Sequence, residues 1–580
     1  MDSVNAENKT NILQWPDYLV ISVIMFVSAS IGLYYRFSGG RQSTSSEYLS
    51  AENSMGMLPL SISLMASQIS AITMLGISGE SYINGLFVVM MYVCNGIAIP
   101  FVIYYYLPVF FELKVVSIYE YLQKRFGLHL RMLVSAANFI ETLMLAGVML
   151  YAPSLALEVT TGLSSTMSIA VIATICTFYS TIGGIKAVLV TDVFQGILMV
   201  ITMSTILAIA AANVEGGVAG IWRIAREGNR LDFDKWSLDP TVKYTWWNVI
   251  FGSTMGLTFI AVNQVQVQRL LTVRNLKTAT NAVILSGPFV VLLAGLTCLT
   301  GVSLYAVYRD CDPVASGKIS SYDKIVTHFT AERMSPGVIG LIISGIFSAS
   351  LSTISAMMNS LAAVALEDYV KPLCQKFGAN FSDNKAVLVA KLLTFLNGVL
   401  CLLLALLART MGGLVAVALS ITGAIGGPIL GIFTLGMFTE NANEAGTYIG
   451  MITALCICMW AAFGQPKPPP SLSPVSVEGC VNSTELLLAA HSSYNSTALP
   501  DKSSYFYLYR ISYMWYNSIG FVITIVVGYV TSIVIRRIRP GNNIEHDPNL
   551  FVPFLASKIR RRRRDAEKTT GSQLFVLDAR

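Results

Sequence analysis

The chain has 580 residues, of which 54% are hydrophobic and only 12% are charged, and its formal net charge is +6. Soluble globular proteins carry about 25% charged residues, so this composition excludes a soluble fold and predicts an all-α integral membrane protein. The four histidines are scattered, and the sequence has no HExxH motif and no Walker-type phosphate loop. It therefore lacks the usual residues of ATP-driven pumping and metal catalysis, and we expect neither an enzyme nor an organic cofactor.

Apolar runs of roughly 20 residues recur along the chain, and each can cross about 30 Å of hydrocarbon. The sequence predicts thirteen membrane-spanning helices, at 17–35, 57–77, 86–108, 130–154, 164–183, 188–212, 244–264, 279–307, 337–364, 387–408, 412–438, 446–464 and 512–535. The expected divisions are an extracellular N-terminus (1–16), a first span with its inner loop (17–56), a ten-span core (57–438), a twelfth span (439–464), an extracellular loop (465–511), a last span (512–535) and a basic cytoplasmic tail (536–580).

Basic residues set the expected orientation, because Lys and Arg favour cytoplasmic loops. Arg36 and Arg41 follow the first predicted span, while Arg536 and the arginine run 560–564 follow the last one. We therefore expect a multi-pass protein of the plasma membrane with its N-terminus outside and its C-terminus inside. The tail lies beside the bilayer and can attract anionic membrane lipid, so we expect no nucleic-acid partner.

The predicted outer segments carry extracellular signals. Glycosylation sequons occur at Asn8, Asn482 and Asn495, all on the predicted outside. Cys311 and Cys480 are the two cysteines in predicted outer loops, which makes them a candidate disulfide. The sequence alone leaves their pairing open.

Two predicted spans carry polar and glycine residues in mid-membrane. The second span holds Ser67, Gln68, Ser70 and Thr73, followed by Gly76 and Gly79. The seventh span reads FGSTMGLTFIAVNQVQVQR (251–269) and has a similar composition. Interrupted helices at matching positions of two halves are typical of carriers, with spans two to six and seven to eleven as inverted repeats. The alternative is that these small residues only allow close helix packing.

The ninth predicted span contains six hydroxyl side chains in the stretch SGIFSASLSTIS (344–355). Uncharged oxygens can coordinate a small hard cation without burying a fixed charge. Ser352 and Thr353 are adjacent and Ala349 lies one turn earlier, so one helix face can present two hydroxyls and a backbone carbonyl. The alternative is that the hydroxyls bond back to their own helix. Elsewhere in the spans, we expect Glu141 to face water or a helix end.

Four motifs resemble one transporter family. They are FYSTIGGIKAVLVTDVFQ (178–195), GAIGGPILGIF (423–433), NQVQVQRLLT (263–272) and LYAPSLAL (150–157). The chain resembles the sodium/solute symporters with a LeuT-type core of two inverted five-helix repeats, in the branch of the iodide, monocarboxylate and multivitamin symporters. The resemblance covers nearly all of residues 15–465.

This resemblance implies the site residues. The first sodium ion is expected between spans two and nine, on the carbonyls of Ala66, Ile69 and Ala349 and the hydroxyls of Ser352 and Thr353. A second sodium is expected near Ser67, Ser70 and Tyr151, and substrate contacts are expected from Gln68, Thr73, Met91 and Tyr151. Asp192 is expected to act in cation exit, with a capping role or an ion pair with Lys186 as the alternative.

The implied function is sodium-coupled import of a small organic anion by alternating access, with Na⁺ as the co-transported ion. Monocarboxylates and vitamins such as biotin or pantothenate are the candidate substrates. Related iodide carriers have Gln where this chain has Thr73, so an iodide-like carrier is the less favoured alternative. A non-transporting nutrient sensor on the same scaffold and a passive channel are the alternatives from other functional classes.

Overall fold

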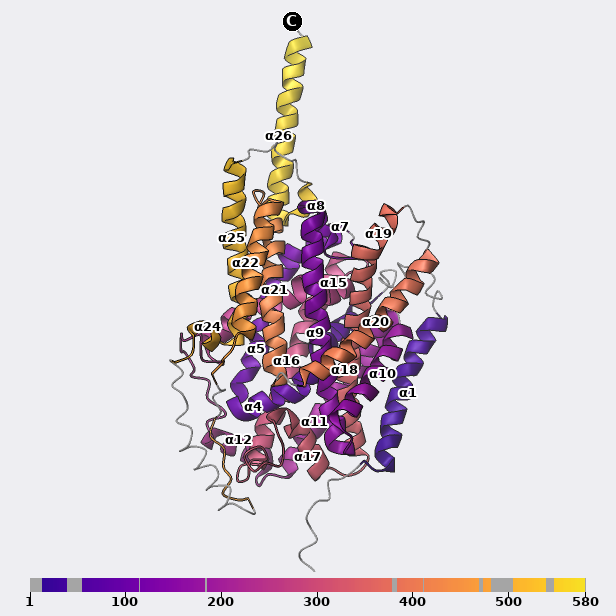
Figure 1. The fold of residues 1–580 in the computed structure, drawn as a ribbon, viewed down its shortest axis with the longest axis vertical. Coiled ribbons are helices and arrows are strands. Elements are labelled where there is room, and N and C mark those ends of the chain that lie inside the picture. The colour runs from indigo at the N-terminus through magenta and orange to yellow at the C-terminus, as the bar shows by residue number, and fades with distance from the viewer. Residues whose placement is uncertain are drawn as a thin grey trace, which may run out of the picture.

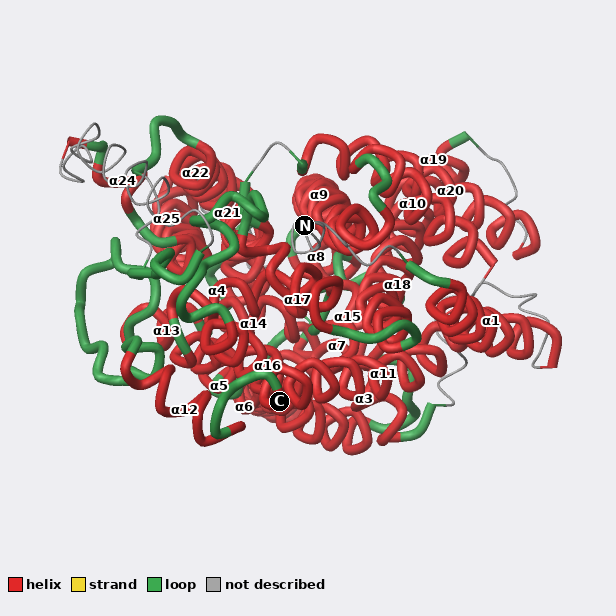
Figure 2. Tube along the Cα trace, turned by 90° about the horizontal axis from the view of Figure 1, so that it is seen from below, coloured by secondary structure: helices red, strands yellow, loops and turns green. Residues whose placement is uncertain are grey.

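A computed structural model describes residues 13–38, 55–113, 115–182, 185–377, 383–409, 412–468, 473–480, 504–538 and 547–578. Within these ranges every regular element is a helix, and no strand occurs (Figure 2). The long helices form one bundle, and α26 (Pro553–Asp578) projects beyond one end of it (Figure 1). The three predicted glycosylation sites lie outside the described residues.

Nine helical stretches of the described residues are long and apolar enough to cross a bilayer. They are the run Leu86–Leu113 (η4 to α7), α9 (Leu128–Thr161), α11 (Ile185–Ala212), α16 (Leu276–Val307), α18 (Val338–Val364), α20 (Asp383–Ala408), α21 (Leu414–Phe438), α22 (Glu444–Phe463) and α25 (Tyr516–Ile538). Three other predicted spans correspond to α1 (Trp15–Ser38) and α10 (Ser165–Ile182), which contain the shorter apolar stretches Trp15–Ile31 and Ser165–Phe178, and to the interrupted run α13 to α15. The total of thirteen stays a prediction.

Shorter helices connect or cap these stretches. They are α8 (Glu120–Arg125), α12 (Gly217–Glu227), η6 (Tyr322–Lys324), α17 (Ile325–Arg333), η7 (Ala365–Val370), α19 (Lys371–Lys376), α24 (Tyr507–Arg510), η9 (Tyr513–Trp515) and η10 (Pro548–Leu550). In Figure 1, α12 and α17 lie at the end of the bundle opposite to α26.

The second span is broken in its middle. Helix α3 (Met57–Gln68) stops at Ile69, whose backbone is extended (φ −101°, ψ 110°), and the chain resumes as η3 (Ile72–Ile77) and α4 (Ser78–Asn84) after a bend of 60°. The Ser70 N–H, which a continuous helix would direct to the Ala66 carbonyl, lies 3.4 Å from Thr73 Oγ1. The break therefore releases backbone oxygen atoms inside the bundle.

A second interruption lies in the seventh span. Helix α13 (Trp246–Gly252) leads into α14 (Thr254–Ala261), and α15 (Gln264–Leu270) begins only after Asn263. Asn263 has extended backbone, and its Oδ1 accepts the N–H of Val265 at 2.9 Å, which caps α15. Both spans that the sequence marks as interrupted are thus interrupted in the structure.

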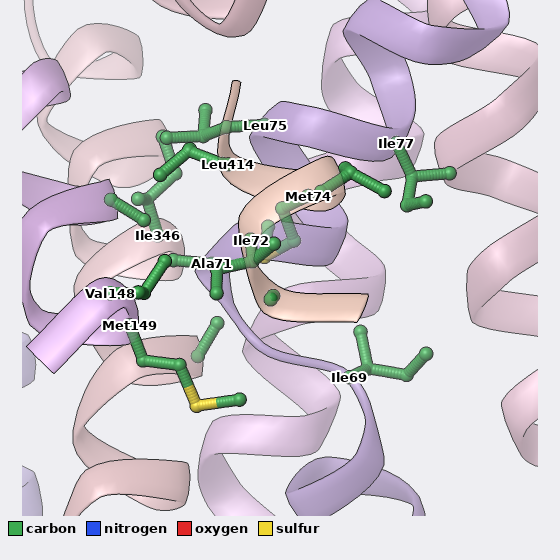
Figure 3. Packing of buried hydrophobic residues seen from close by; sticks show 14 of the residues in the cluster. Ile69, Ala71, Ile72, Met74, Leu75, Ile77, Val148, Met149, Ile346 and Leu414 are labelled. Atoms are coloured by element: carbon green, nitrogen blue, oxygen red, sulfur yellow. The ribbon is translucent and has the colours of Figure 1, made fainter. Parts of the chain in front are cut away.

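Hydrophobic packing holds the first break in place. Figure 3 shows side chains of the segment 69–77 beside Val148 and Met149 of α9, Ile346 of α18 and Leu414 of α21. All of these side chains are buried. Inside a bilayer, close packing of this kind replaces the hydrophobic driving force between helices. The irregular backbone is therefore enclosed by protein, where it is tolerated.

Glu141 does not face water, contrary to the expectation from the sequence. It lies within α9 with 5% of its surface exposed. A Cβ atom at Gly426 of α21 would approach its Oε1 to 3.4 Å, so this glycine leaves room for the carboxyl group. The α9 sequence around Glu141 gives no sign of this partner, because Gly426 lies 285 positions further along the chain.

The short helix η6, called the latch below, bonds to two long helices. Asp323 Oδ2 accepts the backbone N–H of Leu414, the first residue of α21, at 3.2 Å. The next residue, Lys324, places its Nζ 3.2 Å from Glu158 Oε1 near the end of α9. The latch therefore joins two helices that both contribute to the central cavity described below.

The latch contains a titratable carboxyl group. Burial raises the pKa of Asp323 to about 6, and the charge of Glu80 acts in the same direction, whereas the Leu414 N–H acts against it. A Cβ atom at Gly76 of η3 would lie 3.5 Å from Asp323 Oδ1. The carboxyl group thus sits between the broken span and the start of α21.

A disulfide connects two loops. Cys311 and Cys480 are bonded, with 5.0 Å between their Cα atoms and 169 residues between them in the sequence. The bond ties the segment 473–480 to the chain that follows α16.

Candidate functional site

A central cavity of about 110 Å³ lies at the two breaks. It is lined from α3, η3, α5 (Met90–Asn95), α9, α14, α15, α18 and α21. Its polar lining residues are Ser67, Gln68, Ser70, Thr73, Tyr92, Asn95, Asn263, Gln266, Thr353 and Thr422. No Asp, Glu, Lys, Arg or His is among the lining residues within the described part of the chain. An anion in this cavity would meet only neutral groups and any bound cation.

Most predicted substrate and second-sodium residues meet in this cavity. Ser67, Gln68, Ser70, Thr73 and Met91 all line it. Tyr151 is the exception.

Tyr151 is half-buried on α9 and is not among the lining residues of the described chain. The α9 residues that do line the cavity are Leu145 and Met149. Successive helix residues point about 100° apart, so Tyr151 faces a different direction from Met149, two positions before it.

The proposed first sodium site lies between α3 and α18. Its five residues are fully buried: Ala66, Ile69, Ala349, Ser352 and Thr353. The two hydroxyl groups of this set already have protein partners.

Thr353 Oγ1 donates to the Ala349 carbonyl at 3.1 Å, and Ser352 Oγ donates to Asp192 Oδ1 at 2.5 Å. A hydroxyl that donates its proton keeps oxygen lone pairs for a cation. Thr353 also lines the cavity, so this cluster and the cavity are continuous.

Asp192 is the centre of a buried polar cluster. Its carboxylate accepts from Ser352 at 2.5 Å and from Ser63 at 2.6 Å, and it lies 2.8 Å from Arg269 Nη2. Asp192 is 0% and the Arg269 side chain is 1% exposed. Burying a charge costs several kcal/mol unless it is paired and hydrogen-bonded, and here both conditions hold. The cluster joins α3, α11, α15 and α18.

The sequence analysis gave Lys186 as the alternative ion-pair partner of Asp192. Arg269 forms the pair that the structure describes, and the side chain of Lys186 lies outside the described residues. Sequence reasoning also missed Ser63. Arg269 is the basic residue of the apolar and amide-rich NQVQVQR segment (263–269), which suggests a buried charge but does not identify Asp192 as its partner.

Gln266 links the two breaks. Its Nε2 donates to Ser67 Oγ at 2.8 Å, and Ser67 Oγ donates to the Leu64 carbonyl at 2.9 Å. A polar side chain of α15 therefore contacts the last turn of α3. We therefore expect a movement of α3 to displace α15, and the reverse.

The sequence model of the sodium:solute symporter family matches residues 48–454. This chain belongs to the sodium:solute symporter family. It is 42% identical over 575 residues to a Drosophila melanogaster protein provisionally named a sodium-dependent multivitamin transporter, covering 96% of this chain and 94% of that protein. It is 33% identical over 542 residues to human sodium-coupled monocarboxylate transporter 1, covering 89% and 87%.

A solved structure shares the fold. The outward-open, substrate-bound structure of a Na⁺-coupled sialic acid symporter aligns with a TM-score of 0.73 at 22% identity, over 90% of this chain and 98% of that one. The symporter is therefore an all-helical, multi-pass membrane protein with the LeuT-type fold.

Proposed function

We propose that this symporter uses the inward sodium gradient to import a small organic anion across the plasma membrane. The observation that carries the proposal is the placement of Ser352 and Thr353 of α18 against the broken second span, beside a cavity that both elements line. Ala66, Ile69, Ala349, Ser352 and Thr353 supply five neutral oxygens, which suit a monovalent hard cation. Calcium sites usually demand carboxylate ligands.

Sodium couples the two halves by binding between them. The ion bridges α3 and α18, and it stabilises the conformation in which these helices are close, because only that conformation offers all its ligands. The membrane potential contributes about 2.3 kcal/mol per charge per 100 mV. Release toward the cytoplasm then proceeds past Asp192, whose carboxylate already contacts the Ser352 ligand.

The substrate is a small carboxylate. The half-helix that starts at Ile72 directs its N-terminal dipole toward the break, which favours an anion. Gln68, Thr73 and Met91 line the cavity there. The two relatives described above are named for monocarboxylates and vitamins. One sodium balances the charge of a monovalent anion, so a second sodium near Ser67 and Ser70 would make transport electrogenic.

We expect the latch to lie outside and the C-terminal tail to lie inside. The Cys311–Cys480 disulfide supports this assignment, because disulfides persist in oxidising compartments. The arginine run 560–564 in α26, at the opposite end, supports a cytoplasmic tail.

The test is substrate-evoked current and radiolabelled uptake in cells expressing the chain, with and without external sodium. The panel contains lactate, butyrate, nicotinate, pantothenate, biotin, iodide and glucose. Sodium-dependent uptake of one or more carboxylates is expected. No sodium-dependent uptake of any of them, with the protein present at the cell surface, would overturn the proposal. Uptake that never accumulates substrate against its gradient would indicate a channel instead.

A further inference from the structure

One polar side chain of the cavity has no role in the sites described above. Asn95 ends α5 and lines the cavity, and its Oδ1 is fully buried without a hydrogen-bond partner among the described residues. By contrast, Ser67, Gln266 and Asn263 of the same lining are bonded within the protein. A buried polar group without a partner is costly, so its presence in a cavity points to a ligand that supplies one.

Close packing fixes the position of this amide. A Cβ atom at Gly256 of α14 would lie 2.9 Å from the Cβ, Cγ and Oδ1 atoms of Asn95. A side chain at position 256 would therefore force the amide to shift. The Asn95 side chain is packed against α14 at the edge of the cavity.

Thr422 of α21 supplies a second polar group without a partner. Its Oγ1 is fully buried, lines the cavity and has no hydrogen-bond partner in the described chain. Several other buried helical threonines donate to the carbonyl one turn earlier, as Thr353 does to Ala349 and Thr394 does to Ala390. Thr422 departs from this local pattern, so its hydroxyl remains available.

We propose that Asn95 and Thr422 recognise a neutral hydrogen-bonding group of the substrate, so that the preferred substrates are carboxylates that also carry an amide, ureido or hydroxyl group. An amide and a hydroxyl together offer both a donor and an acceptor. A carboxylate only accepts, so it would leave an acceptor such as Asn95 Oδ1 unpaired. A group with its own N–H or O–H can satisfy both side chains.

This inference rests on the proposed function and adds to it a preference among carboxylate substrates. A site with buried hydrogen-bonding groups rejects analogues that lack the matching group, because binding them leaves those groups unpaired. Plain short-chain fatty acids would therefore be poor substrates, although they carry the same carboxylate.

The experiment compares matched substrates in the full chain. Lactate differs from propionate by one hydroxyl, and pantothenate carries amide and hydroxyl groups that butyrate lacks. Sodium-dependent uptake efficiency (Vmax/KM) is measured for wild type, Asn95→Leu and Thr422→Val, with surface protein quantified. Thr394→Val is the control, because it removes a buried hydroxyl that is bonded to its own helix and does not line the cavity.

Wild type is expected to prefer the donor-bearing member of each pair. Each site variant is expected to reduce the efficiency ratio of pantothenate to butyrate by about 10-fold, the effect of leaving one buried polar group unpaired. The ratio should stay unchanged in Thr394→Val. Thr422→Val is nearly isosteric, so it tests the proposal even where Asn95→Leu fails to reach the surface.

Two results would overturn the inference while leaving the proposed function intact. One is wild-type uptake of propionate and butyrate as efficient as that of lactate and pantothenate. The other is an equal loss for both members of a pair together with a raised sodium requirement, which would make Asn95 and Thr422 sodium ligands. Absence of any sodium-dependent uptake would instead refute the proposed function itself.

Discussion

The strongest prediction separates a sodium ligand from its neighbour. Ser352 and Ser63 each donate one hydrogen bond to Asp192, at 2.5 and 2.6 Å. A hydrogen bond to a charged group contributes about 1.5–3 kcal/mol. Changing either serine to alanine therefore removes a similar interaction from the same buried carboxylate. Only Ser352 belongs to the proposed sodium site.

Comparing Ser352→Ala with Ser63→Ala isolates the contribution of the Ser352 oxygen to sodium binding. Relative to Ser63→Ala, the Ser352→Ala variant also loses one of five proposed ligand oxygens. If that oxygen contributes about 1.4 kcal/mol to sodium binding, the sodium concentration for half-maximal uptake rises tenfold. Thr353→Ser, which keeps a hydroxyl, should stay closer to wild type than Thr353→Ala.

The assay is the sodium activation curve of uptake, using the carboxylate with the greatest sodium-dependent uptake in the panel. Surface labelling of each variant corrects for the amount of protein. Identical sodium requirements in Ser352→Ala and Ser63→Ala would refute the reasoning, because Ser352 would then act only through Asp192.

Three other predictions follow from buried or bonded groups. Asp192→Asn leaves Arg269 as an unpaired buried charge, so we expect stability to fall by about 3–5 kcal/mol. Surface expression and the melting temperature in detergent should both be lower, and adding Arg269→Gln should partly restore them. The pKa of Asp323 is raised to about 6, so the packed latch is stabilised below the ordinary carboxyl pKa and loses this stabilisation as pH rises through about 6. If the latch must open for transport, uptake should fall as external pH is lowered from about 7 to 5. The same fall in Asp323→Asn, which cannot titrate, would contradict this role. Cys311→Ser should expose Cys480 to a membrane-impermeant maleimide added outside, whereas wild type should stay unlabelled at this pair; labelling only after permeabilisation would reverse the proposed topology.

Local sequence properties predicted the helices and their interruptions well. Hydropathy follows single spans, and both interrupted spans carry Ser, Gly and amide residues within apolar runs. The hydroxyl pair Ser352 and Thr353 was equally visible, because six hydroxyls in a membrane-length helix are costly unless they have partners. Each of these signals lies within a window of about 20 residues, so the sequence alone reveals it.

Partners across the bundle were not predictable in the same way. Arg269 lies 77 positions from Asp192, and nothing between them in the sequence records the contact. Tyr151 is not among the cavity-lining residues, because Leu145 and Met149 occupy the side of α9 that lines the cavity. Glu141 was expected in water because a carboxylate is costly in a helix bundle, and the space beside Gly426 is visible only in three dimensions.

The Asp192–Arg269 pair changes the physical description of the proposed sodium site. The sequence suggested a set of neutral oxygens, yet the Ser352 ligand lies 2.5 Å from a carboxylate. That carboxylate attracts the cation, while Arg269, 2.8 Å from the same group, repels it. The two charges offset each other, so we expect sodium binding at the proposed site to depend mainly on the ligand oxygens. An unpaired aspartate at this position would attract the cation more strongly, so we expect loss of Arg269 to slow sodium release.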